Sequence, residues 1–143
     1  MNEIIIGGGC FWCLEAAFKE VDGIEKVTSG YAGGQTEDPS YSEVCKGNTG
    51  HAEVVKIAFD SEKITLEKIL KLFFKLHDPT TKDREGPDIG EQYRSIILYQ
   101  NDEQKEIIEN LIEEKREDYS EDIVTEVQEL KQFYRAEEEH QDY

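Results

Sequence analysis

Residues 3–18 read EIIIGGGCFWCLEAAF, and this stretch decides the fold. Its first four residues are rich in isoleucine and predict a short buried strand, which the three glycines at positions 7–9 end in a loop. From residue 11 to residue 21, apolar side chains recur every three or four positions, which is typical of an amphipathic helix. Cys10 is therefore expected at a helix N-terminus, directly after a glycine turn.

Similar patterns predict the remaining elements. We expect strands over 24–31, 52–60, 93–99 and 123–130, helices from 65 to just before Pro79 and over 102–119, and long loops over 32–50 and 78–92. The first six elements then run strand, helix, strand, strand, helix, strand, which is the order of the ferredoxin-like split βαβ unit. The prediction is a single α+β domain over residues 1–143, in which helices pack on a mixed or antiparallel sheet, with an extra C-terminal helix and strand.

The strand expected over 52–60 carries a carboxyl on its apolar side. Glu53 shares that side with Val55, Ile57 and Phe59, because alternate residues of a strand face the same way. Desolvation should raise the pKa of such a carboxyl and let it hold a proton near neutral pH. Antiparallel pairing would also bring both long loops and Cys10 to one edge of the sheet, which makes that edge the candidate active site.

Composition excludes several kinds of partner. The chain has 33 acidic and 16 basic residues, and its formal charge of −17 repels phosphate backbones and anionic lipid surfaces, so we expect no nucleic acid and no membrane. The apolar runs are far shorter than a membrane span, and no basic region precedes a long apolar stretch at the N-terminus. Three cysteines, an odd number, argue against structural disulfides and for the reducing cytoplasm.

Cys10 has features of a nucleophile. A helix N-terminus favours the thiolate, and preceding glycines let a substrate approach the backbone, although a buried structural cysteine would fit the same turn. Cys13 completes a C-x-x-C pair whose sulfurs can form a disulfide across one helical turn. A zinc site would need four ligands, and only Cys45 and isolated histidines stand downstream, so no metal is expected.

Five stretches, in order along the chain, resemble the peptide methionine sulfoxide reductases of type A, and the resemblance spans nearly the whole sequence. They are Gly9-Cys10-Phe11-Trp12, Tyr41 ahead of Gly50-His51-Ala52-Glu53, His77-Asp78-Pro79, Asp88-Ile89-Gly90-Glu91-Gln92-Tyr93-Arg94-Ser95, and His140-Gln141-Asp142-Tyr143.

The resemblance implies a reaction. Cys10 would attack the sulfur of methionine S-sulfoxide, releasing methionine and leaving a sulfenic acid. A second thiol would convert that acid to a disulfide, and thioredoxin, or dithiothreitol in its place, would restore the thiols without any cofactor. Phe11 and Trp12 would form an apolar pocket for the substrate methyl group, which agrees with the affinity of such groups for aromatic rings.

The resemblance also assigns roles around the sulfoxide oxygen. Glu53, Tyr41 and Tyr93 would address this oxygen, and Asp88 would support them. The chemistry agrees, because attack on sulfur moves charge onto the oxygen, which then needs hydrogen-bond donors and a proton. For His51 we expect a structural hydrogen-bonding role.

The sequence departs from the family pattern in three places. Cys13 stands where many relatives have glycine, and Pro87 stands where asparagine is common. The chain ends at Tyr143, without the cysteine-bearing tail from which some relatives resolve the sulfenic acid. The resolving thiol is then Cys13 or Cys45, and the cost of ordering a long loop favours Cys13.

Two other classes of function fit parts of the sequence. A general thiol-disulfide oxidoreductase also places C-x-x-C at the start of a helix after a strand, and it would reduce disulfides in the absence of any sulfoxide. A non-catalytic peptide-binding domain would use Phe11 and Trp12 only to dock methionine, and thiol-dependent turnover would exclude it.

Overall fold

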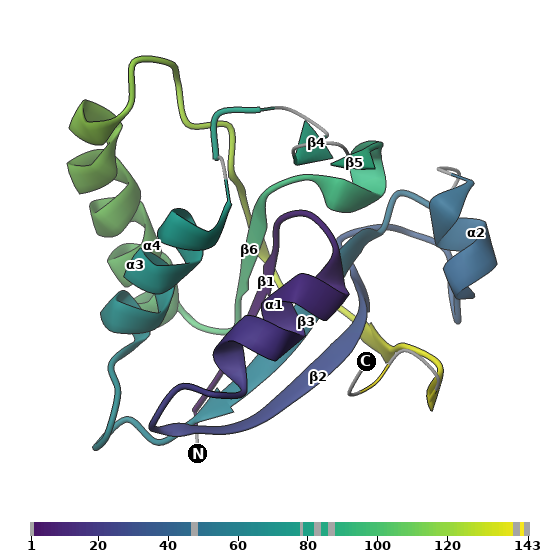
Figure 1. Ribbon diagram of the computed structural model, residues 1–143, viewed down its shortest axis with the longest axis horizontal. Coiled ribbons are helices and arrows are strands. Elements are labelled where there is room, and N and C mark those ends of the chain that lie inside the picture. The colour runs from purple at the N-terminus through teal and green to yellow at the C-terminus, as the bar shows by residue number, and fades with distance from the viewer. Residues whose placement is uncertain are drawn as a thin grey trace.

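The computed structural model describes residues 2–46, 49–77, 79–81, 84–85, 88–138 and 141, and the side chains of all these except 84, 85, 88, 89 and 91. One sheet of six strands runs through the molecule (Figure 1), in the order β7-β6-β1-β3-β2-β8. Its strands are β1 (Asn2–Gly7), β2 (Ile24–Ala32), β3 (Ala52–Phe59), β6 (Ile96–Tyr99), β7 (Glu126–Glu129) and β8 (Phe133–Arg135). Only the pairing of β6 with β7 is parallel among the ladders described. A separate two-stranded ladder joins β4 (Arg84–Glu85) to β5 (Asp88–Ile89).

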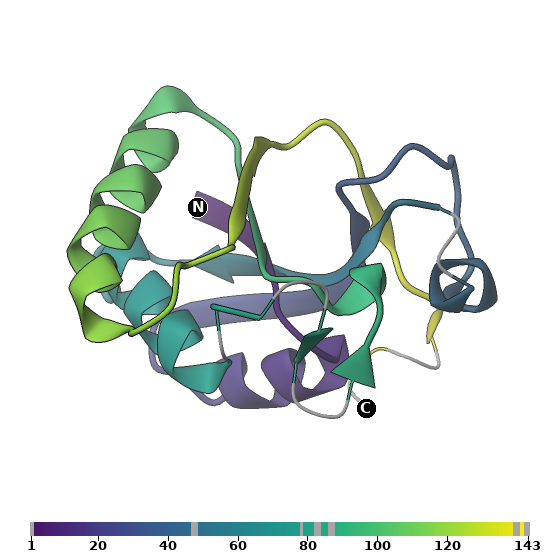
Figure 2. The same ribbon diagram turned by 90° about the horizontal axis from the view of Figure 1, so that it is seen from above.

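Three of the helices cover one face of this sheet, and Figure 2 shows α1 and α3 on the same side of it. The helices are α1 (Phe11–Phe18), α2 (Tyr41–Cys45), α3 (Leu66–Leu76) and α4 (Asp102–Lys115), with 3₁₀ turns η1 (Glu91–Tyr93) and η2 (Arg116–Asp118). The short helix α2 stands apart, beyond the end of β2 (Figure 1). None of the helices in the described ranges is long and apolar enough to cross a membrane.

The central strand β1 is buried on both faces. Ile4 and Ile6 face the main core beneath α1, α3 and α4, whereas Ile5 belongs to a smaller apolar cluster on the opposite face. Leu130, directly after β7, and Phe133, the first residue of β8, pack against that smaller cluster. Strands buried on both sides read as continuous apolar runs, which explains the sequence of residues 4–6.

The predicted α+β class is confirmed, and most of the predicted elements lie within a few residues of their expected bounds. The helix expected to reach residue 21 ends at Phe18. The loop expected over 32–50 contains α2, because Ser40 and Glu43 form a capping box that starts a helix there. The strand expected over 123–130 is confined to β7, and β8 follows as a further edge strand.

Candidate active site

Cys10 lies at the junction between β1 and α1, where it is the N-cap residue of the helix, with extended backbone (φ −73°, ψ 130°) and a partly buried side chain. Gly9 has φ 85°, which L side chains rarely adopt, and its N–H donates to the Tyr93 carbonyl at 3.0 Å. Gly8 packs on His77, whose ring would lie 2.8 Å from a Cβ at that position. The glycine turn therefore holds Cys10 against both η1 and the end of α3.

Glu53 lies beside this turn, near the start of β3, and is 1% exposed. The backbone N–H of Phe11 donates to Glu53 Oε1 at 3.3 Å, so the carboxyl sits over the N-terminus of the helix that Cys10 caps. The prediction that Glu53 lies on the apolar face of its strand is confirmed. Its alternate neighbours in the main core are Val55, Ile57 and Phe59.

An aromatic cluster surrounds the start of α1. Phe11 is fully buried, and its ring centroid lies 5.8 Å from that of Tyr31 and 6.1 Å from that of Tyr41. The ring of Trp12 stacks on that of Tyr41 at 6.1 Å. Tyr41 lies in the first long loop, and Tyr93, predicted to begin a strand, instead ends the 3₁₀ turn η1 at the end of the second loop. Both loops therefore reach the start of α1.

Tyr93 and Asp88 differ in how fully the structure describes them. Tyr93 ends η1 and is partly buried, and it is near enough to Tyr41 to raise the pKa of that phenol. Asp88 is described only in its backbone, which pairs with Glu85 in the β4–β5 ladder. Its side chain lies outside the described residues. So do Pro87 and four other motif residues, Asp78, His140, Asp142 and Tyr143.

The helix N-terminus favours the Cys10 thiolate, as expected, but burial outweighs its effect in the free protein. Burial, the largest cause, raises the pKa of the Cys10 thiol to about 11. The N–H groups of Trp12 and Cys13 lower this pKa, while the charge of Glu53 raises it. Removing the charge of Glu53 would therefore shift Cys10 toward the thiolate.

Both neighbouring tyrosines keep their protons. Burial is the largest cause that raises the pKa of Tyr41, followed by a hydrogen bond with the Cys45 thiol. Burial also raises the pKa of Tyr31, followed by its hydrogen bond to Glu137. Each phenol therefore remains a neutral hydrogen-bond donor across the physiological pH range.

The two candidate resolving thiols both lie near the site. Cys10, Cys13 and Cys45 are all free, and Cys13 and Cys45 are exposed. The Cys13 N–H donates to the Cys10 carbonyl at 3.2 Å, and its thiol contributes to the pKa of Cys10. The Cys45 thiol is hydrogen-bonded to Tyr41, and the charge of Glu53 raises its pKa. The first long loop therefore reaches the site, and the cost of ordering it no longer argues against Cys45 as the resolving thiol.

His51 is structural, as expected. The N–H of Gly34 donates to its Nδ1 at 3.0 Å, so Nε2 carries the hydrogen and donates to the Thr36 carbonyl at 2.7 Å. These bonds tie two parts of the first long loop to the start of β3. Among the described residues, no group of three or more His, Cys, Asp or Glu could hold a metal ion.

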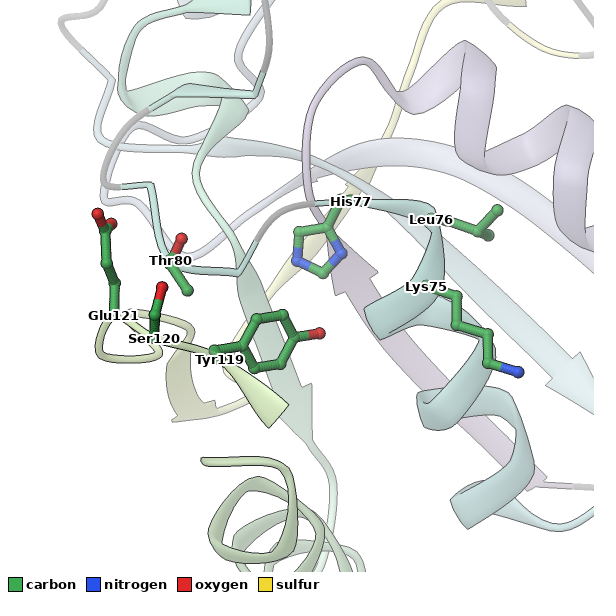
Figure 3. A pocket seen from close by; sticks show the side chains of 7 residues that line it. All are labelled: Lys75, Leu76, His77, Thr80, Tyr119, Ser120 and Glu121. Carbon is green, nitrogen blue, oxygen red and sulfur yellow. The ribbon is translucent and has the colours of Figure 1, made fainter. Parts of the chain in front are cut away.

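A hollow of about 600 Å³ lies elsewhere, between the end of α3 and the segment after α4 (Figure 3). Its lining is polar and contains no cysteine: Lys75, Leu76, His77, Thr80, Tyr119, Ser120 and Glu121. Both nitrogens of His77 are engaged, one with the Phe73 carbonyl and one with Ser95 Oγ, each at 2.7 Å. The candidate reactive residues Cys10 and Glu53 therefore do not line this hollow.

Sequence reasoning missed two groups that complete the site. Tyr31 pairs directly with Glu53 between β2 and β3, and its hydroxyl donates to Glu137 Oε1 at 2.9 Å. The other oxygen of Glu137 accepts from the backbone N–H of Tyr41 at 3.0 Å. Alternation along 24–31 could have put Tyr31 on the inner face, whereas the sequence holds no signal for contacts about a hundred residues apart.

The site brings a thiol, a buried carboxyl and neutral phenols around an apolar wall. A nucleophile with donors ready for developing charge suits attack on an oxygen-bearing centre. The class of protein is thus a cysteine-dependent enzyme on an α+β fold.

Comparison with known proteins agrees with this class and narrows it. The family model for peptide methionine sulfoxide reductase matches residues 2–143. The peptide methionine sulfoxide reductase MsrA of Natronomonas pharaonis is 61% identical over 140 residues, which cover 96% of this chain and 79% of that protein. Reduced Mxr1 from Saccharomyces cerevisiae has a TM-score of 0.93 and 35% identity, over 97% of this chain and 81% of that chain. Mxr1 in complex with Trx2 has a TM-score of 0.72 and 28% identity, over 97% and 83%.

The chain belongs to the peptide methionine sulfoxide reductase family.

Proposed function

We propose that this protein reduces methionine S-sulfoxide, free or within proteins, to methionine, with Cys10 as the nucleophile. The observation that carries the proposal is the family match over residues 2–143 together with the position of Cys10 beside the buried carboxyl of Glu53. A binding module would not need a thiol next to a proton source. A general disulfide reductase would not need the aromatic wall.

The substrate sits with its methyl group against the aromatic cluster. Phe11 and Trp12 supply the apolar surface, and the Tyr41 ring that stacks on both closes one side. Thioether-like groups gain from contact with aromatic rings. This orientation points the sulfoxide oxygen toward Glu53 and the hydroxyls of Tyr41 and Tyr93, with Asp88 in support.

The reductase step moves one oxygen atom to sulfur of the enzyme. The Cys10 sulfur attacks the sulfoxide sulfur while Glu53 gives a proton to the oxygen, and the phenols of Tyr41 and Tyr93 hydrogen-bond to it. Once Glu53 has given up its proton, it takes the proton that Cys10 loses. The products are methionine and a Cys10 sulfenic acid, and no net proton is consumed.

The sulfenic acid then condenses with a second thiol. The thiol is Cys13, whose attack on Cys10 forms the disulfide and releases water. Support comes from the single helical turn between the two residues and from the influence of the Cys13 thiol on the pKa of Cys10. Cys45 is the alternative, since Tyr41 links it to the same site.

Thioredoxin regenerates the enzyme: its dithiol donates two electrons to the enzyme disulfide and is itself oxidised to a disulfide. Dithiothreitol can replace thioredoxin. Mxr1, which has the same fold, has been solved with Trx2. The exposure of Cys13 supports access by such a partner. No metal or other cofactor takes part, and neither nucleic acid nor membrane is a partner.

Residues 1–143 form one domain in the cytoplasm, with a ferredoxin-like split βαβ core. The strand order β6-β1-β3-β2 and the antiparallel pairing of all neighbours in it support this core. The extra α4 and β7 attach at its β6 edge.

The test of the activity uses the separate S and R epimers of a methionine sulfoxide peptide with dithiothreitol. We expect turnover of the S epimer alone, and none with Cys10→Ser, because an alcohol cannot replace the thiolate as a nucleophile. Consumption of an added disulfide in place of sulfoxide would support the general oxidoreductase. Substantial turnover by Cys10→Ser would remove Cys10 from the mechanism.

The test of the resolving thiol is a thiol count and peptide map after one equivalent of sulfoxide without reductant. We expect a Cys10–Cys13 disulfide in the wild type and in Cys45→Ser, and an unresolved sulfenic acid in Cys13→Ser. If Cys13→Ser still forms a disulfide and cycles with thioredoxin while Cys45→Ser does not, the role passes to Cys45.

A further inference from the structure

We infer that Glu137 is a positioning residue for the reductase step, which fixes the Tyr41 wall of the substrate pocket against its Phe11–Tyr31 floor. The inference rests on the proposed role of Tyr41. Glu137 itself does not touch the thiol in any contact described here, so it acts through the two tyrosines.

One carboxylate makes both contacts. Glu137 Oε1 accepts from the hydroxyl of Tyr31 at 2.9 Å, and Oε2 accepts from the backbone N–H of Tyr41 at 3.0 Å. Tyr31 is fully buried and packs on Phe11, whereas Tyr41 is partly buried and packs on both Phe11 and Trp12. The carboxylate therefore joins the floor of the aromatic cluster to its wall.

A carboxylate suits this place because both of its partners donate. Tyr41 is the first residue of α2, and an N–H in the first turn of a helix has no acceptor within that helix. Ser40 caps the N–H of Glu43 and leaves that of Tyr41 to Glu137. Negative charge at a helix N-terminus adds to the attraction.

The C-terminal segment that carries Glu137 is held on both sides of it. Upstream, the Ala136 N–H donates to the Ser29 carbonyl at 2.9 Å, directly beyond the β2–β8 ladder. Downstream, the amide side chain of Gln141 accepts from the Ser29 N–H at 3.0 Å and donates to the Ser29 carbonyl at 2.8 Å. Glu137 is thus supported from β2, and its position does not depend on α2.

The test compares three variants of the full chain. Glu137→Ala removes both acceptors, whereas Glu137→Gln keeps one acceptor for the Tyr41 N–H and can donate to the Tyr31 oxygen. Glu138→Gln is the matched control, because the neighbouring side chain is 84% exposed and pairs only with Arg135 at 3.0 Å among the contacts described. Single-turnover reduction of the S-sulfoxide is measured together with the emission and acrylamide quenching of Trp12, the only tryptophan of the chain.

We expect Glu137→Ala to slow single turnover about tenfold or more, since small misplacements of catalytic groups have effects of this size. Trp12 should also become easier to quench as Tyr41 moves off it. Glu137→Gln should restore most of both, and Glu138→Gln should change neither. A thermal melt run in parallel separates this result from unfolding, because a purely structural role would lower the melting temperature without altering the rate or the quenching below it.

A double-variant cycle identifies the route of the effect. In a Tyr41→Ala background, Glu137→Ala should alter the single-turnover rate by no more than about twofold, because the side chain that it positions is already gone. Additive losses, an unchanged rate in Glu137→Ala, or an equal loss in Glu138→Gln would overturn the inference. An inactive wild type would instead contradict the proposed function.

Discussion

The groups around Cys10 shift the pKa of its thiol in opposite directions. Burial and the charge of Glu53 raise its pKa, the N–H groups of Trp12 and Cys13 lower it, and the outcome is about 11. Near neutral pH only about one molecule in ten thousand of the free protein then carries the thiolate. The resting thiol is therefore protected from indiscriminate oxidants and alkylating agents. Substrate binding has to activate Cys10.

The first prediction concerns alkylation of the free protein. Because the thiolate is the reactive form, the rate at which iodoacetamide modifies Cys10 should rise about tenfold per pH unit between about pH 7 and pH 10. The measurement is mass spectrometry of the peptide that carries Cys10, over a pH series without sulfoxide. A plateau already near neutral pH would mean that the thiol is ionised at rest.

The second prediction is that Glu53→Gln has opposite effects on two reactions. Sulfoxide reduction in single turnover should slow about a hundredfold or more, because the proton source is lost. Alkylation in the alkaline range where the Cys10 thiol ionises should instead become faster, since the charge that Glu53 carries there, and that raises the pKa of Cys10, is gone.

Glu15→Gln is the control for that experiment. Glu15 is another buried acidic residue, but it lies five positions beyond Cys10 along α1 and accepts a hydrogen bond from Ser29 Oγ at 2.6 Å. Glu15→Gln replaces the same kind of side chain as Glu53→Gln, and it should leave the alkylation rate of Cys10 unchanged. Parallel changes of both rates in Glu53→Gln would contradict the assignment of Glu53 as the proton source.

At the scale of single residues, the sequence predicts which residues are candidates for the reaction better than it predicts their protonation state. Cys10 and Glu53 follow from the glycine turn and from strand alternation, both of which are local patterns. The pKa of Cys10 does not follow, because it sums burial and charge from segments distant in sequence. The link from Glu137 to Tyr31 spans 106 residues and leaves no local trace.

The helix α2 is short, but it carries Tyr41 and so bears directly on the candidate site. It has five residues, too few to be stable alone, and the Ser40–Glu43 capping box together with Glu137 holds its first turn. The S-x-x-E pattern at 40–43 was available in the sequence, so this helix could have been predicted. The edge strand β8 could not, because three residues give too little periodicity to interpret.

The third prediction compares two helix caps. Ser40→Ala and Thr65→Ala each remove a side-chain acceptor from a helix N-terminus, at a cost of about 1 kcal/mol of stability. Only Ser40→Ala should also slow sulfoxide reduction several-fold, because α2 carries Tyr41. Chemical denaturation and single-turnover rates check both. Equal rates in the two variants would mean that the cap of α2 has no bearing on the site.

The whole molecule carries a large surplus of negative charge. The formal charge is −17, and residues 100–143 alone hold 16 acidic and 5 basic side chains. The exposed ion pairs offset little of this, since pairs such as Lys71–Glu67 gain only modest energy in water. Self-repulsion therefore opposes the compact state.

The fourth prediction follows from that repulsion. Raising NaCl from about 10 mM to about 0.5 M shortens the Debye length from about 30 Å to only a few Å, so the melting temperature should rise by several degrees. KCl at the same ionic strength should have the same effect. A melting temperature that stays flat or falls would show that the acidic side chains are already spaced widely enough not to repel.

The side-chain amide of Gln141 takes the place of a strand backbone beside β2, because it occupies both the N–H and the carbonyl of Ser29. Farther along β2, residues Gly30 to Ala32 pair instead with the backbone of β8. In hydrogen-exchange terms, the amide of Ser29 reports the docking of a single side chain, and its protection measures how often the C-terminal segment lifts away while the sheet stays intact.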